Sequence, residues 1–253
     1  MILKFDVYMH MLDTYRKIHM YLPDDYLTSN KKYPVLYMFD GHNLFYDEDA
    51  TYGRSWRLID AIQRNGKEII VVGQECSHEG NDRLNEYSPY PFYDTHFGSF
   101  PGKGEATMNF LIEDLKLYID LHFPTLSDRK HTWIGGSSCG GLMALYAVFK
   151  YSKVYSKAIV LSPYILPTLN MLMADINETY ILHHTSIYLS WGAQEGDGMH
   201  EFVMETKGCT DLANLLLKKG VWIHFHVKPL GRHCEEDWEK ESDQFLSFLM
   251  HES

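Results

Sequence analysis

One short stretch of this sequence combines residue types that could perform nucleophilic chemistry. Residues 136–140 read Gly-Ser-Ser-Cys-Gly, a Gly-x-Ser-x-Gly pattern centred on Ser138. The residues before it, 131–134, are β-rich and apolar at their end, and residues 142–149 after it are good helix formers. A serine at a tight strand-to-helix turn is held out on strained backbone, and flanking glycines remove side chains that would clash. The pattern predicts that Ser138 is a nucleophile; the alternative is a glycine-rich turn without chemistry.

A serine nucleophile needs a general base, and His233 is in the right kind of place. Active groups of doubly wound sheets lie beyond the carboxyl ends of strands, and the base follows the serine in chain order. His233 comes in the turn after the predicted strand 221–227. The other downstream histidines fit less well, because they lie inside that strand, before it or at the chain end: His224, His226, His200 and His251.

The base in turn needs an orienting acid. The predicted strand 186–191 is followed by Gly192 and then by two carboxylates, Glu195 and Asp197. Either could reach a histidine from the end of that strand. The alternative is that both are solvated carboxylates of a turn.

Two backbone amides are candidates for stabilising an oxyanion. The Cys139 amide lies at the start of the predicted helix and points to where negative charge would develop. The predicted strand 34–39 ends in the turn 40–43, in which the His42 amide is the second candidate. The alternative for residues 40–43 is a simple tight turn.

Residues 74–104 form a long segment without clear periodicity. They carry many aromatic residues among Pro and Gly, namely Tyr87, Tyr90, Phe92, Tyr93, Phe97 and Phe100. Loops of this length are usually functional or disordered, and the aromatic content argues against disorder. We predict that Tyr90 and Phe92 bind substrate; the alternative is ordinary covering of the core.

The rest of the chain alternates between strand and helix patterns. Residues 2–8 and 14–22 read as two antiparallel strands, and apolar runs such as 34–39 are typical of strands buried on both faces. The remaining predicted strands are 68–72, 157–161, 186–191 and 221–227, and the predicted helices are 56–64, 105–121, 199–218 and 235–249. This order predicts one α/β domain over residues 1–253, with a mostly parallel sheet, antiparallel N-terminal strands and helices on both faces.

Composition excludes several classes of function. The formal net charge of -11 disfavours nucleic-acid binding, and the absence of an apolar stretch of about 18 residues argues against a membrane span. We find no signal peptide and no disulfide framework among the four cysteines, so we expect a cytoplasmic protein with reduced thiols. The fourteen histidines show no HExxH or similar spacing, so we expect neither a metal nor a cofactor.

The sequence resembles the putative-esterase family of the α/β-hydrolase superfamily. That family includes S-formylglutathione hydrolases, feruloyl esterase domains, siderophore esterases and mycolyltransferases. The resemblance is carried by residues spread over most of the chain, at 16–23, 33–45, 136–140, 192–195 and 231–233. It implies an α/β-hydrolase fold with Ser138 as nucleophile, His233 as base and Glu195 as acid. Two positions depart from the family pattern: the acid, often Asp, is Glu195, and the residue after the serine, often Met or Leu, is Cys139.

These observations predict a serine carboxylesterase that acts on a small-molecule ester with a small or aromatic acyl group. A thioesterase of the S-formylglutathione hydrolase type and an acyltransferase remain alternatives within the enzymes. A binding protein on a hydrolase fold is the alternative from another class. The sequence leaves the substrate and the oligomeric state open.

Overall fold

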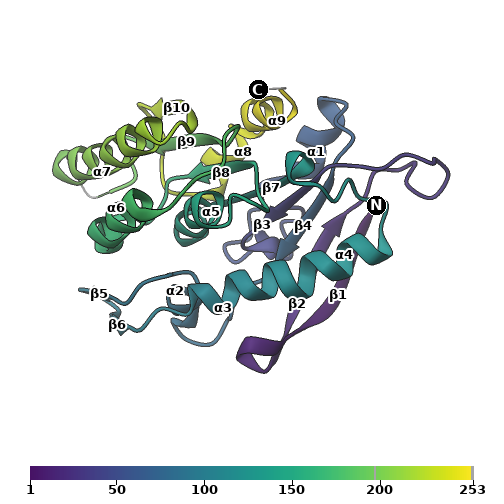
Figure 1. Ribbon diagram of the computed structural model, residues 1–253, viewed down its shortest axis with the longest axis horizontal. Helices are drawn as coiled ribbons and strands as arrows, with labels where there is room; N and C mark the ends of the chain where they lie inside the picture. The colour runs from purple at the N-terminus through teal and green to yellow at the C-terminus, as the bar shows by residue number, and fades with distance from the viewer. Residues whose placement is uncertain (197, 252–253) are drawn as a thin grey trace.

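A computed structural model describes residues 1–196 and 198–251 of the chain, and its central feature is a large sheet (Figure 1). Within these residues its eight strands are β1 (Ile2–Met9), β2 (Thr14–Tyr21), β3 (Val35–Met38), β4 (Ile70–Gln74), β7 (Thr132–Ser137), β8 (Lys157–Leu161), β9 (Ser186–Gly192) and β10 (Trp222–Lys228). Their order in the sheet is β1-β2-β4-β3-β7-β8-β9-β10. β2 pairs antiparallel with β1 and β4, and the other neighbouring strands are parallel. The predicted α/β class, with antiparallel N-terminal strands, is confirmed.

Helices lie on both faces of this sheet. The α-helices are α1 (Leu58–Arg64), α2 (Asp82–Glu86), α3 (Gly104–Asn109), α4 (Leu117–His122), α5 (Cys139–Lys150), α6 (Leu169–Glu178), α7 (Met199–Lys218), α8 (Glu235–Glu239) and α9 (Ser242–Met250). A π-helical stretch, η3 (Phe110–Lys116), joins α3 to α4, and short 3₁₀ turns occur at η1 (His10–Leu12), η2 (Gly41–Asn43), η4 (Arg129–His131) and η5 (Leu166–Thr168). In the part of the chain that the structure describes, we see no helix long and apolar enough to cross a bilayer.

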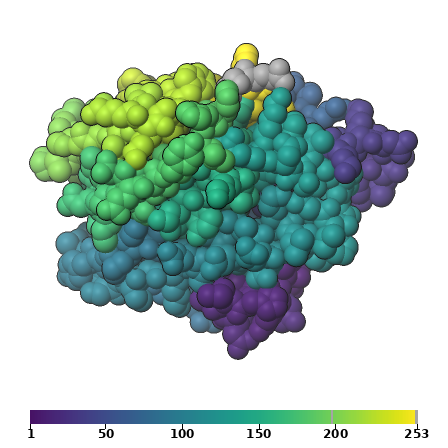
Figure 2. Space-filling view, in the orientation of Figure 1, coloured from purple at the N-terminus to yellow at the C-terminus, as the bar shows by residue number. Residues whose placement is uncertain are grey.

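Successive side chains along each strand point to opposite faces of the sheet. In β8, Ala158 and Val160 join one hydrophobic cluster, whereas Ile159 and Leu161 join the other. The first cluster is covered by α3–α4, α5, α6 and α7, and the second by α1, α8 and α9. In Figure 1 the helix from α3 to α4 crosses in front of β1 and β2, and in Figure 2 the tip of the β1–β2 hairpin projects as a purple group.

Three predicted elements differ from the structure. Residues 74–104 are not wholly irregular, because they contain α2 and a hairpin of β5 (Phe92–Asp94) with β6 (Gly98–Phe100). Elements this short show no periodicity in sequence. The predicted helix 235–249 is divided into α8 and α9, and the predicted helix 105–121 runs from Gly104 to His122 through the π-helical stretch.

The loops after β9 and β10 are brought together by two glycines. A Cβ atom built on Gly192 would lie 2.3 Å from the carbonyl oxygen of Gly231. The Gln194 amide also donates a hydrogen bond to that carbonyl, at 2.9 Å. Only glycine permits so close an approach of two backbones. The loop carrying Glu195 is therefore fixed against the loop carrying His233.

We expect Gly192→Ala to destabilise the protein, because the new methyl group forces these loops apart. Overpacking of this kind costs roughly 1–3 kcal/mol in the free energy of unfolding. In a chain of this size, each kcal/mol lowers Tm by about 2–4 °C, which thermal melting followed by circular dichroism would measure. Gly198→Ala is the control, because a Cβ there meets nothing within 4 Å. Equal Tm values for Gly192→Ala and wild type would contradict the tight contact.

Candidate active site

Ser138 lies on a strained turn between β7 and α5. Its backbone has φ 56° and ψ -124°, a region that residues other than glycine rarely occupy. A Cβ on Gly136 would lie 2.6 Å from the Gly140 carbonyl carbon, so a side chain there would block the turn. The Ser138 amide donates to the Leu161 carbonyl at 3.0 Å, which ties the turn to β8. These features are those of a nucleophile elbow.

His233 and Glu195 are in contact. The Nδ1 atom of His233 lies 3.1 Å from Oε2 of Glu195. The other carboxylate oxygen, Oε1, accepts hydrogen bonds from the Ser162 hydroxyl at 2.7 Å and from the Gly192 amide. The carboxylate is thus held by three groups, and it fixes the orientation of the imidazole ring. The other candidate acid, Asp197, lies outside the described residues.

Two residues that sequence reasoning missed support this carboxylate. The Trp238 indole donates to the Ser162 hydroxyl at 2.9 Å, and that hydroxyl donates to Glu195. The Trp238 ring also packs edge-on against the His233 ring, with centroids 5.1 Å apart. Ser162 directly follows β8, and its place after a parallel strand was the only signal in the sequence that could have identified it.

Ser138 and His233 line one cavity of about 620 Å³. Its walls also include His42, Arg83 and Trp238, so the space in front of the serine is both polar and aromatic. Ser137, the neighbouring serine, is buried at the end of β7 and reaches the same cavity.

The two predicted oxyanion donors lie at the starts of helical turns. Cys139 is the first residue of α5, and His42 is within the short turn η2 after β3. Amides at helix starts lack intrahelical acceptors and remain available to an anion. Cys139 is buried as a whole, and its thiol also interacts with the Ser138 side chain. Donation by these two amides stays a prediction.

An ion pair between the half-buried Arg83 and the buried Asp40 holds the loop that carries His42. Asp40 accepts two hydrogen bonds from the Arg83 guanidinium, at 2.9 and 2.7 Å. Burial acts to raise the pKa of Asp40, but the charge and hydrogen bonds of Arg83 outweigh it and lower that pKa below its ordinary value. Arg83 lies on α2, within the segment predicted to be irregular. This segment therefore contributes an arginine to the cavity wall, which the sequence did not reveal.

The structure does not bring Tyr90 and Phe92 to the wall of the Ser138 cavity. The Tyr90 hydroxyl donates to Asp175 at 2.8 Å, and its ring packs edge-on against Tyr146. Phe92 stacks on Phe100 across the β5–β6 hairpin, with ring centroids 5.0 Å apart. Both rings pack against the protein itself, and substrate binding by either stays a prediction.

Glu205 of α7 and Glu195 line a second cavity of about 350 Å³, which His233 also borders. Burial, and then the negative charge of Glu195, raise the pKa of Glu205 to about 8. At neutral pH this carboxyl group is therefore mostly protonated, and Glu195 does not face a second full charge there.

The strand order, the elbow and the histidine–carboxylate pair define the α/β-hydrolase class of proteins. Comparison with known proteins agrees. The Esterase family (Putative esterase) matches residues 10–248, so the chain belongs to this family.

Two curated relatives and a solved structure are also similar to this chain. The uncharacterized protein YbbA of Bacillus subtilis is 25% identical over 144 residues, which are 56% of this chain and 54% of YbbA. Esterase Rv1288 of Mycobacterium tuberculosis is 30% identical over 141 residues, 56% of this chain and 27% of that protein. The matched part is thus about half of YbbA and about a quarter of Rv1288. An IroE-like serine hydrolase from Shewanella oneidensis has a similar fold, with a TM-score of 0.76 and 16% identity over 97% of this chain and 80% of that one.

We expect Ser162→Ala to lower kcat for ester hydrolysis while leaving KM nearly unchanged. The substitution removes a hydrogen bond to a carboxylate, worth about 1.5–3 kcal/mol, or roughly a tenfold to hundredfold loss in rate. Steady-state kinetics would measure it. Ser186→Ala is the matched control, because the buried Ser186 hydroxyl has no hydrogen-bond partner among the described residues. Equal kcat values in the two variants would contradict the supporting role.

We expect Glu205→Gln to stabilise the protein increasingly as pH rises from about 4 to about 8. The folded chain holds the Glu205 proton over this range and the unfolded chain does not, so wild-type stability falls with pH until the folded pKa of about 8 is passed. The variant lacks this loss, and its advantage reaches the order of a few kcal/mol. Urea unfolding at several pH values would measure it, with Glu178→Gln, an exposed carboxyl, as control. A constant difference across that range would refute the shift.

Proposed function

We propose that this chain is a serine carboxylesterase that works through an acyl-enzyme intermediate. The observation that carries the proposal is the strained Ser138 in a cavity shared with His233, whose Nδ1 atom lies 3.1 Å from Oε2 of Glu195. Membership of the Esterase family supports the reaction class. The similar fold of the Shewanella oneidensis protein, an IroE-like serine hydrolase, supports the type of nucleophile.

In this mechanism the Ser138 hydroxyl attacks the ester carbonyl carbon and transfers its proton to His233. Glu195 holds the imidazole in one tautomer and stabilises the imidazolium that forms. The amides of Cys139 and His42 donate hydrogen bonds to the oxyanion. His233 then gives the proton to the departing alcohol. Water attacks the acyl-enzyme in the second half, with His233 again as base, and releases the acid and free Ser138.

The cavity favours a small or aromatic acyl group. Its volume of about 620 Å³ is in the ordinary range for small-molecule sites. Trp238 supplies an aromatic wall, and Arg83 and His42 supply polar groups for orientation. A panel of p-nitrophenyl and hydroxycinnamoyl esters beside thioesters would separate an esterase from a thioesterase. Addition of alcohols as acceptors would reveal an acyltransferase.

We expect Ser138→Ala to abolish ester hydrolysis, with a loss on the order of 10⁶ in kcat, because the nucleophile is gone. Ser137→Ala should keep most of the activity, since Ser137 ends β7 instead of occupying the strained turn. A fluorophosphonate should label wild type on Ser138, as peptide mass spectrometry would show. Absence of labelling would favour a binding protein on this fold. An adduct on Ser137 would show that Ser137, and not Ser138, is the nucleophile.

A further inference from the structure

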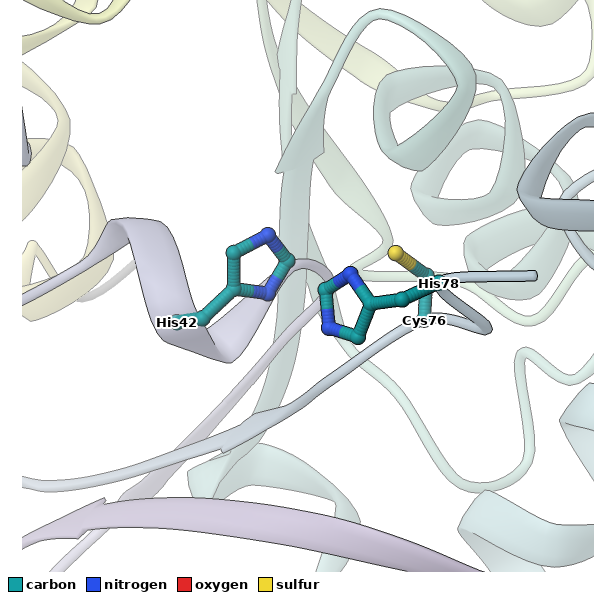
Figure 3. Close-up of side chains that lie close together, drawn as sticks. All are labelled: His42, Cys76 and His78. Atoms are coloured by element: carbon teal, nitrogen blue, oxygen red, sulfur yellow. The ribbon is translucent and has the colours of Figure 1, made fainter. Parts of the chain in front are cut away.

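Three possible metal ligands lie together beside the proposed nucleophile. One ligand atom each from His42, Cys76 and His78 lies within 4.8 Å of the other two. Figure 3 shows the His78 ring between the His42 ring and the Cys76 sulfur. His42 follows β3, whereas Cys76 and His78 follow β4, and these two strands are parallel neighbours in the sheet. Two loops distant in sequence are thereby placed side by side.

The hydrogen bonds of the two histidines leave the same atom free on each ring. Nε2 of His42 is 3.0 Å from the Thr51 hydroxyl, while its Nδ1 is buried and has no hydrogen-bond partner among the described residues. His42 as a whole is 4% exposed, so this nitrogen gains little from water. Nε2 of His78 is 3.1 Å from a Glu75 carboxylate oxygen, which leaves its Nδ1 available as well. When Nε2 carries the proton in both rings, each Nδ1 presents a lone pair.

From this arrangement we propose that His42, Cys76 and His78 form a binding site for a divalent transition-metal ion, with zinc the best fit. Two imidazoles and one thiolate are the ligand types that zinc prefers. Thr51 and Glu75 act as the outer partners that orient histidine ligands in metal sites. The fourth coordination position faces the cavity, because all three residues line it.

Binding requires one proton transfer and a small closure of the ligands. Cys76, whose thiol lies beside the Asp40 carboxylate, releases its proton to solvent as the sulfur–zinc bond forms. Zinc bonds of about 2.0–2.3 Å require the three ligand atoms to approach one another by roughly 1 Å. His78 can move toward the other two ligands, because its side chain is 57% exposed, and side-chain rotation of the buried His42 and Cys76 would supply the rest. Asp40 and Glu75 balance part of the positive charge, and Arg83 stays paired with Asp40.

A zinc ion at this position stands in the cavity that Ser138 faces. It therefore obstructs an ester that approaches the serine, and zinc should inhibit hydrolysis reversibly. This effect on hydrolysis rests on the proposed function, whereas metal binding itself does not.

The first test is spectroscopic and needs no activity. Chelator-treated protein is titrated with Co²⁺ and then with Zn²⁺. We expect one Co²⁺ per chain, with a thiolate-to-cobalt charge-transfer band that zinc abolishes. Cys76→Ser should lose this band, and His78→Ala should weaken cobalt affinity by at least about tenfold, with folding checked by circular dichroism. Glu75→Gln should weaken affinity by about 10–100-fold as the loss of an outer partner.

The matched control is Cys234→Ser, because Cys234 lines the same cavity but lies outside the three-residue group. The band should persist in this variant and in Cys209→Ser, whose thiol is buried in α7. Persistence of the band in Cys76→Ser, or its loss in Cys234→Ser, overturns the site, as does an affinity in wild type no higher than in His78→Ala.

The second test measures ester hydrolysis with zinc. Wild type should be inhibited and should recover with EDTA, and His78→Ala should require at least about tenfold more zinc for half inhibition. Metal binding without inhibition would overturn the position of the ion in front of Ser138. If wild type hydrolyses no ester, the proposed function fails, and the cobalt spectra still decide the metal site by themselves.

Discussion

The close passage of the loops after β9 and β10 is the constraint on which the candidate site depends. Glu195 and His233 come from separate strands, and their contact requires the two backbones to meet at Gly192 and Gly231. The parallel pairing of β9 with β10 sets the direction of both loops. Because Gly192 and Gly231 have no side chains, the two loops can lie this close together. Without both conditions, a carboxylate and an imidazole at these positions would remain separate solvated groups.

A second layer of contacts fixes the orientation of the catalytic candidates. The hydrogen bonds from Trp238 to Ser162 and from Ser162 to Glu195 start on α8, the helix after β10, and end at the Glu195 carboxylate. Trp238 also packs on His233, so one side chain supports both His233 and, through Ser162, Glu195. The protonated state of Glu205 at neutral pH keeps a second charge away from this pair. The elements around the site thus act on its electrostatics as well as on its geometry.

The other side of the cavity is built differently. There the Asp40–Arg83 pair joins the loop after β3 to α2, and histidines and a cysteine face the same space. Removal of Arg83 would be costly, because the buried Asp40 charge would stay without a partner. This side therefore combines an ion pair with ligands that could hold a metal, next to Ser138. The aromatic rings of Tyr90 and Phe92 lie apart from that wall and pack against neighbouring elements.

The sequence by itself determined the class of sheet and the position of the elbow. Both are local properties. Apolar runs indicate strands that are buried on two faces, and the Gly-x-Ser-x-Gly spacing indicates a turn that only small residues permit. It also placed Glu195 and His233 in loops after strands. It did not predict α2 or the β5–β6 hairpin, because elements of three to five residues carry no periodic signal.

Only the tertiary structure decided which residues meet. Strands that are neighbours in the sheet but distant in the chain bring several residues to the site. These residues are Ser162, Arg83 and the His42–Cys76–His78 group. The histidines show no metal-binding spacing along the sequence, because the proposed ligands His42, Cys76 and His78 come from two loops. Spacing along a chain reveals only ligands on one segment, whereas strand order, which sequence does not display, brings separate segments into contact.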